Sequence, residues 1–142
     1  MGSVLEKAQL IKAESARIGE YLKKLSPQAW STPSACDAWQ VQDVVAHLTG
    51  GVDRFAPNIV RGAGGDGSAP EGAPPAGVGD MEARLRANAQ VAIDFRESLG
   101  AELLKAFNSN CVKLDEALSG LAEADVAKPC YHPAGTCISY IF

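Results

Sequence analysis

The sequence contains no basic segment and no long apolar run, and each absence excludes a class of protein. Its formal net charge is −4 and its pI about 5.1, which argues against a protein that tracks nucleic-acid phosphates. No apolar run approaches the roughly 18 residues that a membrane helix needs. The first residues, "MGSVLEKAQLIKAESAR", are charged and periodic, unlike a secretory signal. We therefore expect a cytoplasmic protein with neither a nucleic-acid nor a membrane partner. Its four cysteines are then reduced thiols: Cys36, Cys111, Cys130 and Cys137.

Strand signals and internal repeats are lacking as well. No segment alternates apolar and polar residues between turn signals, so no strands are predicted. Three segments instead repeat apolar residues every three or four positions, the period of amphipathic helices. A chain of 142 residues is of ordinary size for one domain. We predict a single all-α domain over residues 1–142, in which long helices joined by short connections form a bundle.

The first helical segment begins near Ser3 and ends before Pro27. Ser3 and Glu6 have the spacing of a capping box, which satisfies free N–H groups at a helix start. The residue before a proline disfavours the helical conformation, so the helix has ended by Pro27. Its apolar stripe consists of Val4, Ala8, Ile11, Ser15, Ile18, Leu22 and Leu25.

The second segment begins after Gln40, a poor capping residue. Asp43, at the third helical position, partly compensates through the helix dipole. Gly50 and Gly51 lie inside the segment and weaken the helix by roughly 1 kcal/mol each relative to alanine. Such a pair indicates close helix packing or a bend. The apolar stripe consists of Val41, Val44, Val45, Leu48, Val52, Phe55 and Ile59.

A loop rich in glycine and proline follows, over residues 61–79. It has seven glycines and three prolines and almost nothing to bury, so we expect it to be mobile. It also contains Gly62-x-Gly64-x-x-Gly67, the spacing of a dinucleotide-binding loop. That motif requires a strand before it and a helix directly after it. Here a helix precedes it and a proline-rich stretch follows, so we reject a nucleotide site.

The third helical segment begins at Met81, with Asp80 as its N-cap, and extends to Leu121. Gly100 interrupts it, and the sequence leaves open whether this glycine breaks the helix or bends it. In the second half, apolar residues again repeat at steps of three and four: Leu104, Phe107, Cys111, Leu114, Leu118 and Leu121.

His47 is one of only two histidines in the chain. On a helix it lies beside Val44 and Leu48, with Asp43 one turn before it. A carboxylate there could orient the imidazole as a partner of a metal ligand. It could equally be a helix-start acid that does not contact the histidine. From periodicity alone, the alternatives for His47 are a metal ligand and a structural residue at the edge of the core.

Two further candidates come from the cysteines. Cys130, His132 and Cys137 lie close together, and thiolates with imidazole suit zinc, but their spacing matches no common zinc module. The alternative is a loop with two thiols and a partly exposed histidine. Cys36 precedes a helix start, where a thiol pKa can be lowered, yet no base partner is evident. The alternative for Cys36 is a small packed thiol between Trp30 and Trp39.

Residues 30–50, "WSTPSACDAWQVQDVVAHLTG", form the most distinctive stretch of the chain. They resemble the N-terminal domain of the mycothiol-dependent maleylpyruvate isomerase family, in the DinB/YfiT-like metal-binding superfamily. The residues that match in order are Trp30, Pro33, Cys36, Trp39, Val41, Asp43 and His47. The surrounding layout is similar too, with a helix before, a Gly/Pro-rich loop after, a long helical region and a His-Pro-x-Gly segment at His132.

This resemblance implies a four-helix bundle that binds a divalent metal, for which zinc is the expectation and nickel the alternative. The histidine of Val-Ala-His-Leu is a metal ligand in such proteins, which assigns that role to His47. Family members use mycothiol or a related thiol for isomerisation or transfer, and the metal polarises or deprotonates the thiol. A small-molecule thiol and a substrate would then be the partners of an active protein.

Two departures from the family pattern qualify this expectation. Gln40 replaces the usual capping Ser or Thr. The family's other two ligands lie on a fourth helix, in a Glu-x-x-x-His arrangement, and Thr136–Phe142 resembles only the first turns of that helix. We therefore expect a truncated fourth helix and an incomplete metal site, with His132, a cysteine or a second chain as further ligand. The alternative is a non-catalytic helical bundle that forms a homodimer across the groove left uncovered.

Overall fold

A computed structural model describes residues 2–135 of the chain. Its long helices are α1 (Val4–Leu22), α3 (Val41–Ala63), α4 (Met81–Leu99) and α5 (Leu103–Ser119). Shorter elements are α2 (Pro27–Trp30) and the 3-10 turns η1 (Gly100–Glu102) and η2 (Glu123–Ala127). Within the described range, extended pairing is limited to two isolated bridges, Pro33 with Gln40 and His132 with Gly135. The all-α prediction is confirmed. The expected start of a fourth helix at Thr136–Phe142 lies outside the described residues.

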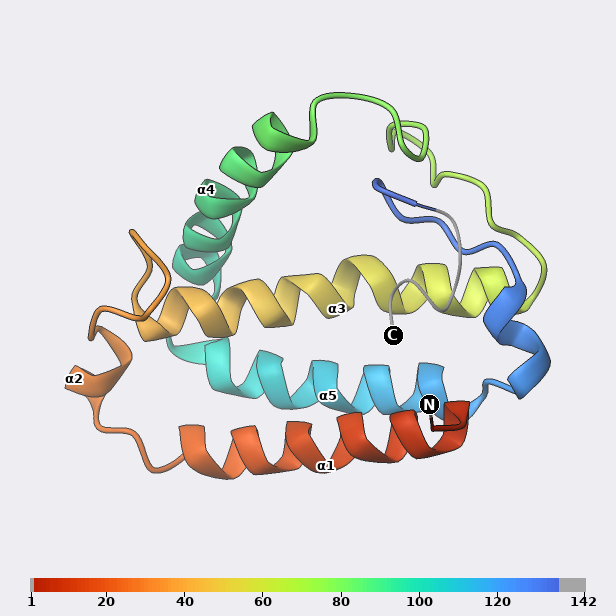
Figure 1. The fold of residues 1–142 in the computed structure, drawn as a ribbon. Coiled ribbons are helices and arrows are strands. Elements are labelled where there is room, and N and C mark those ends of the chain that lie inside the picture. Colours follow the sequence, from red (N-terminus) through yellow and green to blue (C-terminus); the bar gives the residue numbers. More distant parts are fainter. Residues whose placement is uncertain (1, 136–142) are drawn as a thin grey trace.

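Helix α1 begins with the capping box that the sequence predicts. Glu6 N donates to Ser3 Oγ at 3.2 Å, and Ser3 N donates to Glu6 Oε2 at 2.7 Å. The stripe then turns Val4, Ala8 and Leu22 into the core. Figure 1 shows α1, α5 and α3 lying side by side, with α5 between the other two.

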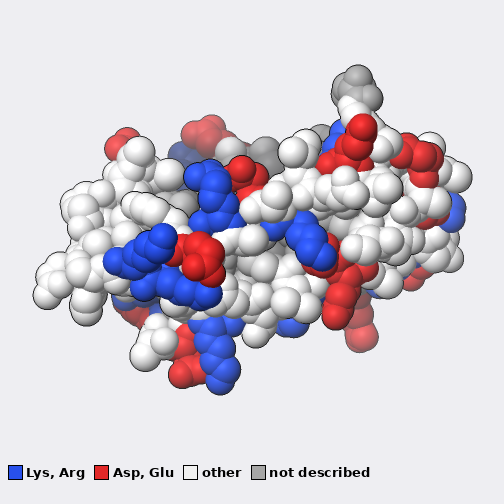
Figure 2. Space-filling model, turned by 90° about the horizontal axis from the view of Figure 1, so that it is seen from below, with Lys and Arg blue, Asp and Glu red and all other residues white. Residues whose placement is uncertain are grey.

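The solvent face of α1 carries charges of both signs. Figure 2 shows Lys and Arg beside Asp and Glu over this face of the molecule. Two short ion pairs lie along the helix, Arg17 with Glu14 at 2.7 Å and Lys23 with Glu20 at 2.6 Å. This face therefore carries charges of both signs and is a solvent-exposed surface without a patch of one charge.

Helix α3 starts without a side-chain cap from Gln40. Asp43 replaces it, since Asp43 Oδ2 accepts from Gln40 N at 2.9 Å. The helix passes through Gly50, Gly51 and Pro57. A Cβ at Gly50 would lie 3.3 Å from Phe95 Cδ1, so this glycine allows α4 to approach closely. A Cβ at Gly51 would meet no atom of another segment within 4 Å, so close packing explains only the first glycine of the pair.

Gly100 breaks the third segment instead of bending it. Its φ is +52°, a conformation that residues with a Cβ rarely adopt. The η1 turn follows, and α5 then begins at Leu103. Figure 1 shows α4 rising steeply away from the direction of α5, on the far side of α3. Because of this break, α4 packs on α3 and stands outside the three-helix layer.

Two apolar clusters form the core. The first contains Ala8, Ile59, Leu118 and Cys130, and the second contains Leu22, Val45, Ala46, Leu103 and Phe107. Each cluster joins α1, α3 and α5, as the helical stripes predict. No helix in residues 2–135 has the length and apolar character needed to cross a membrane.

The Gly/Pro-rich segment packs against the stretch after η2. A Cβ at Gly62 would lie 2.7 Å from Pro129 O, and one at Gly67 would lie 2.6 Å from Pro129 Cβ. Gly62 and Gly67 of the rejected dinucleotide motif thus allow close approach of two backbones. Gly62 lies in the last turn of α3, so a helix and not a strand leads into the motif, as the rejection assumed. The loop begins only at Gly64, because α3 extends to Ala63. The mobility of this loop stays a prediction.

Candidate functional site

His47 lies on α3 where two cavities meet. One, of about 220 Å³, separates α3 from α4 and is lined by Gly50 and Phe95. The other, of about 280 Å³, is lined by side chains of α1, α3 and α5, including Ile11 and Leu114. The His47 ring packs against Trp39, with a centroid distance of 5.0 Å and a tilt of 42°. The imidazole is therefore half-buried: Trp39 packs against its ring, and the two cavities border it.

The environment of His47 favours the neutral imidazole. Burial lowers its pKa below the ordinary value of 6.5, and the positive charge of Arg54 lowers the pKa further. A neutral imidazole offers a nitrogen lone pair, which is the form that binds metals. The electrostatics of this position thus suit a metal ligand, although they suit a buried structural histidine equally.

Asp43 engages partners other than His47. It is almost fully buried, and its Oδ1 accepts from Arg96 Nε at 2.9 Å, while its Oδ2 accepts from Gln40 N. Both carboxylate oxygens therefore have partners. Of the two alternatives for Asp43, the structure supports the helix-start acid.

The Asp43–Arg96 pair and Trp39 fasten α4 beside the histidine. Arg96 comes from the last turn of α4, and Trp39 Nε1 donates to Ala89 O on the same helix at 3.2 Å. Trp39, Asp43 and His47 are spaced four residues apart, so they follow one side of the chain as it enters α3. Trp39 and Asp43 hold α4 in position, and His47 faces the cavity between α3 and α4.

His132 lies on a different cavity from His47. It belongs to a tight turn in which His132 N donates to Gly135 O at 3.0 Å, and its Nδ1 accepts from Ala134 N at 3.0 Å. Its ring stacks on Phe55 at 4.9 Å, and burial lowers its pKa. The role of His132 as an additional ligand stays a prediction.

Among residues 2–135, no cysteine joins a histidine in a group of three potential metal ligands. Cys36 is exposed in the loop before α3, where its backbone makes the hydrogen bonds to Ser34 and Trp39. Cys130 is fully buried in the first core cluster, as a packed thiol. Its expected neighbour Cys137 lies outside the described residues.

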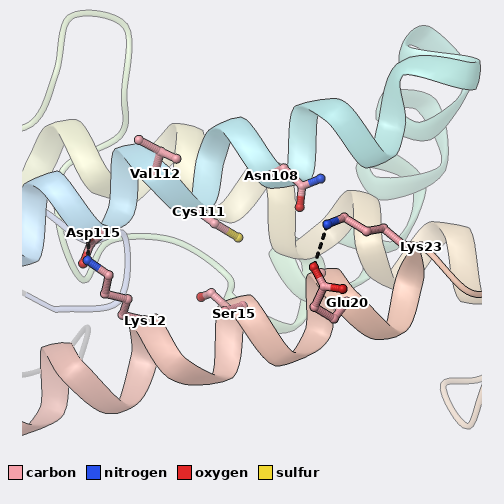
Figure 3. A pocket seen from close by; sticks show the side chains of 10 residues that line it. Lys12, Ser15, Glu20, Lys23, Asn108, Cys111, Val112 and Asp115 are labelled. Atoms are coloured by element: carbon pink, nitrogen blue, oxygen red, sulfur yellow. Dashed lines mark hydrogen bonds and ion pairs between the residues drawn. The ribbon is translucent and has the colours of Figure 1, made fainter.

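Cys111 points into a cavity of about 250 Å³ between α1 and α5 (Figure 3). Burial raises the pKa of this thiol, and a hydrogen bond with Ser15 opposes that effect. At the edge of the cavity, Lys12 Nζ lies 2.7 Å from Asp115 Oδ2. A thiol with a raised pKa is a poor nucleophile, and Cys111 packs against the second core cluster.

A complete metal centre does not arise from the described residues. Across residues 2–135, no three side chains of His, Cys, Asp or Glu gather closely enough to hold a metal ion. An open catalytic zinc site uses three protein ligands. The described part of the chain therefore does not fit such a site by itself, whatever the role of His47.

Comparison with known families decides the identity of the fold. The family model of the mycothiol maleylpyruvate isomerase N-terminal domain matches residues 11–139. The chain belongs to this family. The match covers α3, α4, α5 and the part of α1 from residue 11 onward, so the all-α DinB-like bundle extends well beyond the stretch around His47. No curated protein and no solved structure matches the chain.

Sequence reasoning identified the family from residues 30–50, but it missed the partners that build the site. Arg96 had no distinguishing signal, because its partner Asp43 lies 53 residues away. Arg54 and Arg84 were also missed, and they line a cavity of about 650 Å³ beside α3 and α4. A search for arginines with no acidic residue three or four positions away would have selected Arg54 and Arg96, but not Arg84, because Asp80 lies four positions before it.

Proposed function

We propose that this chain is a DinB-like domain that binds a divalent metal, zinc or else nickel, through His47. In this proposal it acts with mycothiol or a related small thiol in isomerisation or transfer chemistry, as its family suggests. The supporting observation is a half-buried imidazole with a lowered pKa at the junction of two cavities, on the histidine of the Val-Ala-His-Leu segment that resembles the family's.

The rest of the ligand set must come from outside residues 2–135, or from a residue that moves. Residues 2–135 contain no three-ligand cluster, so they do not by themselves carry a metal-dependent reaction. What they contribute is the support of His47. Trp39 packs on its ring, and the Asp43–Arg96 pair keeps α4 in place beside it.

Zinc titration of the whole chain tests this proposal. The protein is purified without a nickel column, stripped with a chelator, and titrated with zinc against a chromophoric competitor. We expect His47→Ala to weaken zinc binding by at least about tenfold, the smallest loss typical even for partners of metal ligands. The matched variant His132→Ala tests the second histidine, and a loss there identifies it as the additional ligand. Absence of zinc binding by the wild type, or unchanged binding by His47→Ala, overturns the proposal.

The second candidate is a non-catalytic bundle that functions as a homodimer. It is favoured by an apolar groove along α3, the cavity of about 280 Å³ that His47 borders. Ile11, Leu48, Val52 and Leu114 line this groove, and Leu48 is 44% exposed. An uncovered apolar surface of this kind favours association. In this alternative His47 is a boundary residue without a metal.

A further inference from the structure

A large cavity lies on the opposite side of α3 from α1. Its volume is about 650 Å³, within the range of small-molecule sites. Figure 1 shows its walls on one side of α3: helix α4, the loop that precedes it, and the stretch after η2. Apolar side chains line most of it, among them Phe55, Pro74, Met81, Leu85 and Tyr131.

Hydrogen bonds fasten these walls to one another. Pro133 O accepts from Gly77 N at 2.7 Å and from Arg84 Nη1 at 3.1 Å, which joins the loop, the final turn and α4 at one atom. Tyr131 donates its hydroxyl hydrogen to Pro74 O at 2.7 Å. Arg84 also donates to Val78 O. The cavity is thus bordered by elements that hold each other in place, as a preformed site requires.

The arginines that line this cavity differ from the other arginines of the chain in their ion pairs. Four of the six form ion pairs with carboxylates: Arg17 with Glu14, Arg61 with Asp66, Arg86 with Glu82, and Arg96 with Asp43. The remaining two are Arg54 and Arg84, for which the described residues provide no carboxylate partner, and both line the cavity.

The charge of this pair is uncompensated inside the cavity. No Asp or Glu is among the lining residues. The acceptors of Arg84 are backbone carbonyls, which are neutral, and Arg54 lies 5.9 Å from the centre of the Phe55 ring. Two guanidinium groups at the surface of an apolar cavity attract an anion more strongly than they would in water, because the local dielectric constant is lower.

We propose that this cavity binds a small organic anion with a hydrophobic body, whose carboxylate or phosphate group is held by Arg54 and Arg84. Arg84 is fixed by its two carbonyl partners, and it retains further N–H donors for the ligand. Arg54 is exposed on α3 and can close on the anion from the other wall. Phe55, Met81 and Leu85 then contact the hydrophobic part. This site does not depend on a metal at His47.

Three probes with the same aromatic body distinguish the chemistry: phenylacetate, phenyl phosphate and the neutral 2-phenylethanol. Binding to the metal-free whole chain is measured by protein NMR titration. We expect one of the anions to bind at least about tenfold more tightly than the alcohol, as charge-assisted hydrogen bonds require. The better anion shows whether the site prefers carboxylate or phosphate.

The variant Arg54→Gln is expected to lose about tenfold in affinity for the preferred anion while binding of the alcohol stays unchanged. Arg86→Gln is the matched control, because Arg86 is exposed on α4 and paired with Glu82. His47→Ala is expected to bind the anion like the wild type, which separates this site from the proposed metal function. Equal affinities for anion and alcohol, undetectable binding of all three probes, or an unchanged Arg54→Gln variant overturns the proposal.

Discussion

At the scale of single residues, we expect the Asp43–Arg96 pair to contribute more to stability than any exposed ion pair in the described structure. The Asp43 side chain is 3% exposed, whereas the other acidic partners of the ion pairs are more accessible. We predict that Asp43→Asn lowers the free energy of unfolding by about 3 kcal/mol, because it removes the buried counter-charge of Arg96 and weakens the start of α3. Arg96 then retains only the exposed Glu97 carboxylate, 3.6 Å away. Urea denaturation followed by circular dichroism measures the change.

The control for this prediction is Asp53→Asn. Asp53 also lies on α3 and pairs with Lys113 at 3.3 Å, but both side chains are exposed. Pairs of this kind contribute less than about 1 kcal/mol. Similar effects of the two substitutions would show that burial of the Asp43 pair does not matter for stability.

At the scale of elements, the contact between the end of α3 and Pro129 depends on glycine. A Cβ at Gly62 would lie 2.7 Å from the carbonyl oxygen of Pro129, a backbone atom that cannot turn aside. We predict that Gly62→Ala destabilises the protein by about 1–3 kcal/mol, the usual cost of overpacking. Thermal and urea unfolding provide the measurement.

Gly51→Ala is the matched substitution in the same helix. No described atom lies within 4 Å of a Cβ there, so alanine adds helix propensity without a clash. It should raise stability by up to about 1 kcal/mol. If both substitutions changed stability in the same direction, the close approach at Gly62 would not be the cause.

At the scale of the whole molecule, we predict that two copies of the chain associate through the apolar groove beside His47. We predict a homodimer at micromolar concentration, and we predict that Leu48→Asp converts it to a monomer by placing a charge in the groove. Light scattering measures the mass of both forms. Leu5→Asp is the control, because Leu5 is 63% exposed but does not line the groove. A monomeric wild type contradicts this prediction.

Local signals in the sequence were sufficient for the helices and for the family. The Ser3–Glu6 cap, the Asp80 cap and the apolar stripes involve residues within one or two helical turns, so their physics is contained in short segments. The motif around His47 is contiguous and was recognisable for the same reason. Even so, the break at Gly100 stayed open, because glycine permits both a bend and a break.

Only the tertiary structure decided which side chains meet. From the sequence, Asp43 could orient a histidine or begin a helix. In the fold, Arg96 of α4 donates to one of its carboxylate oxygens and Gln40 N to the other. Arg54 and Arg84 look like ordinary surface arginines in the sequence, and they share a cavity only because the chain after η2 returns across α3. The sequence by itself determined the helices and the family through short-range hydrogen bonding and periodicity. The cavities and the pairing of charges depend on contacts between residues far apart in the chain, which only the packed fold specifies.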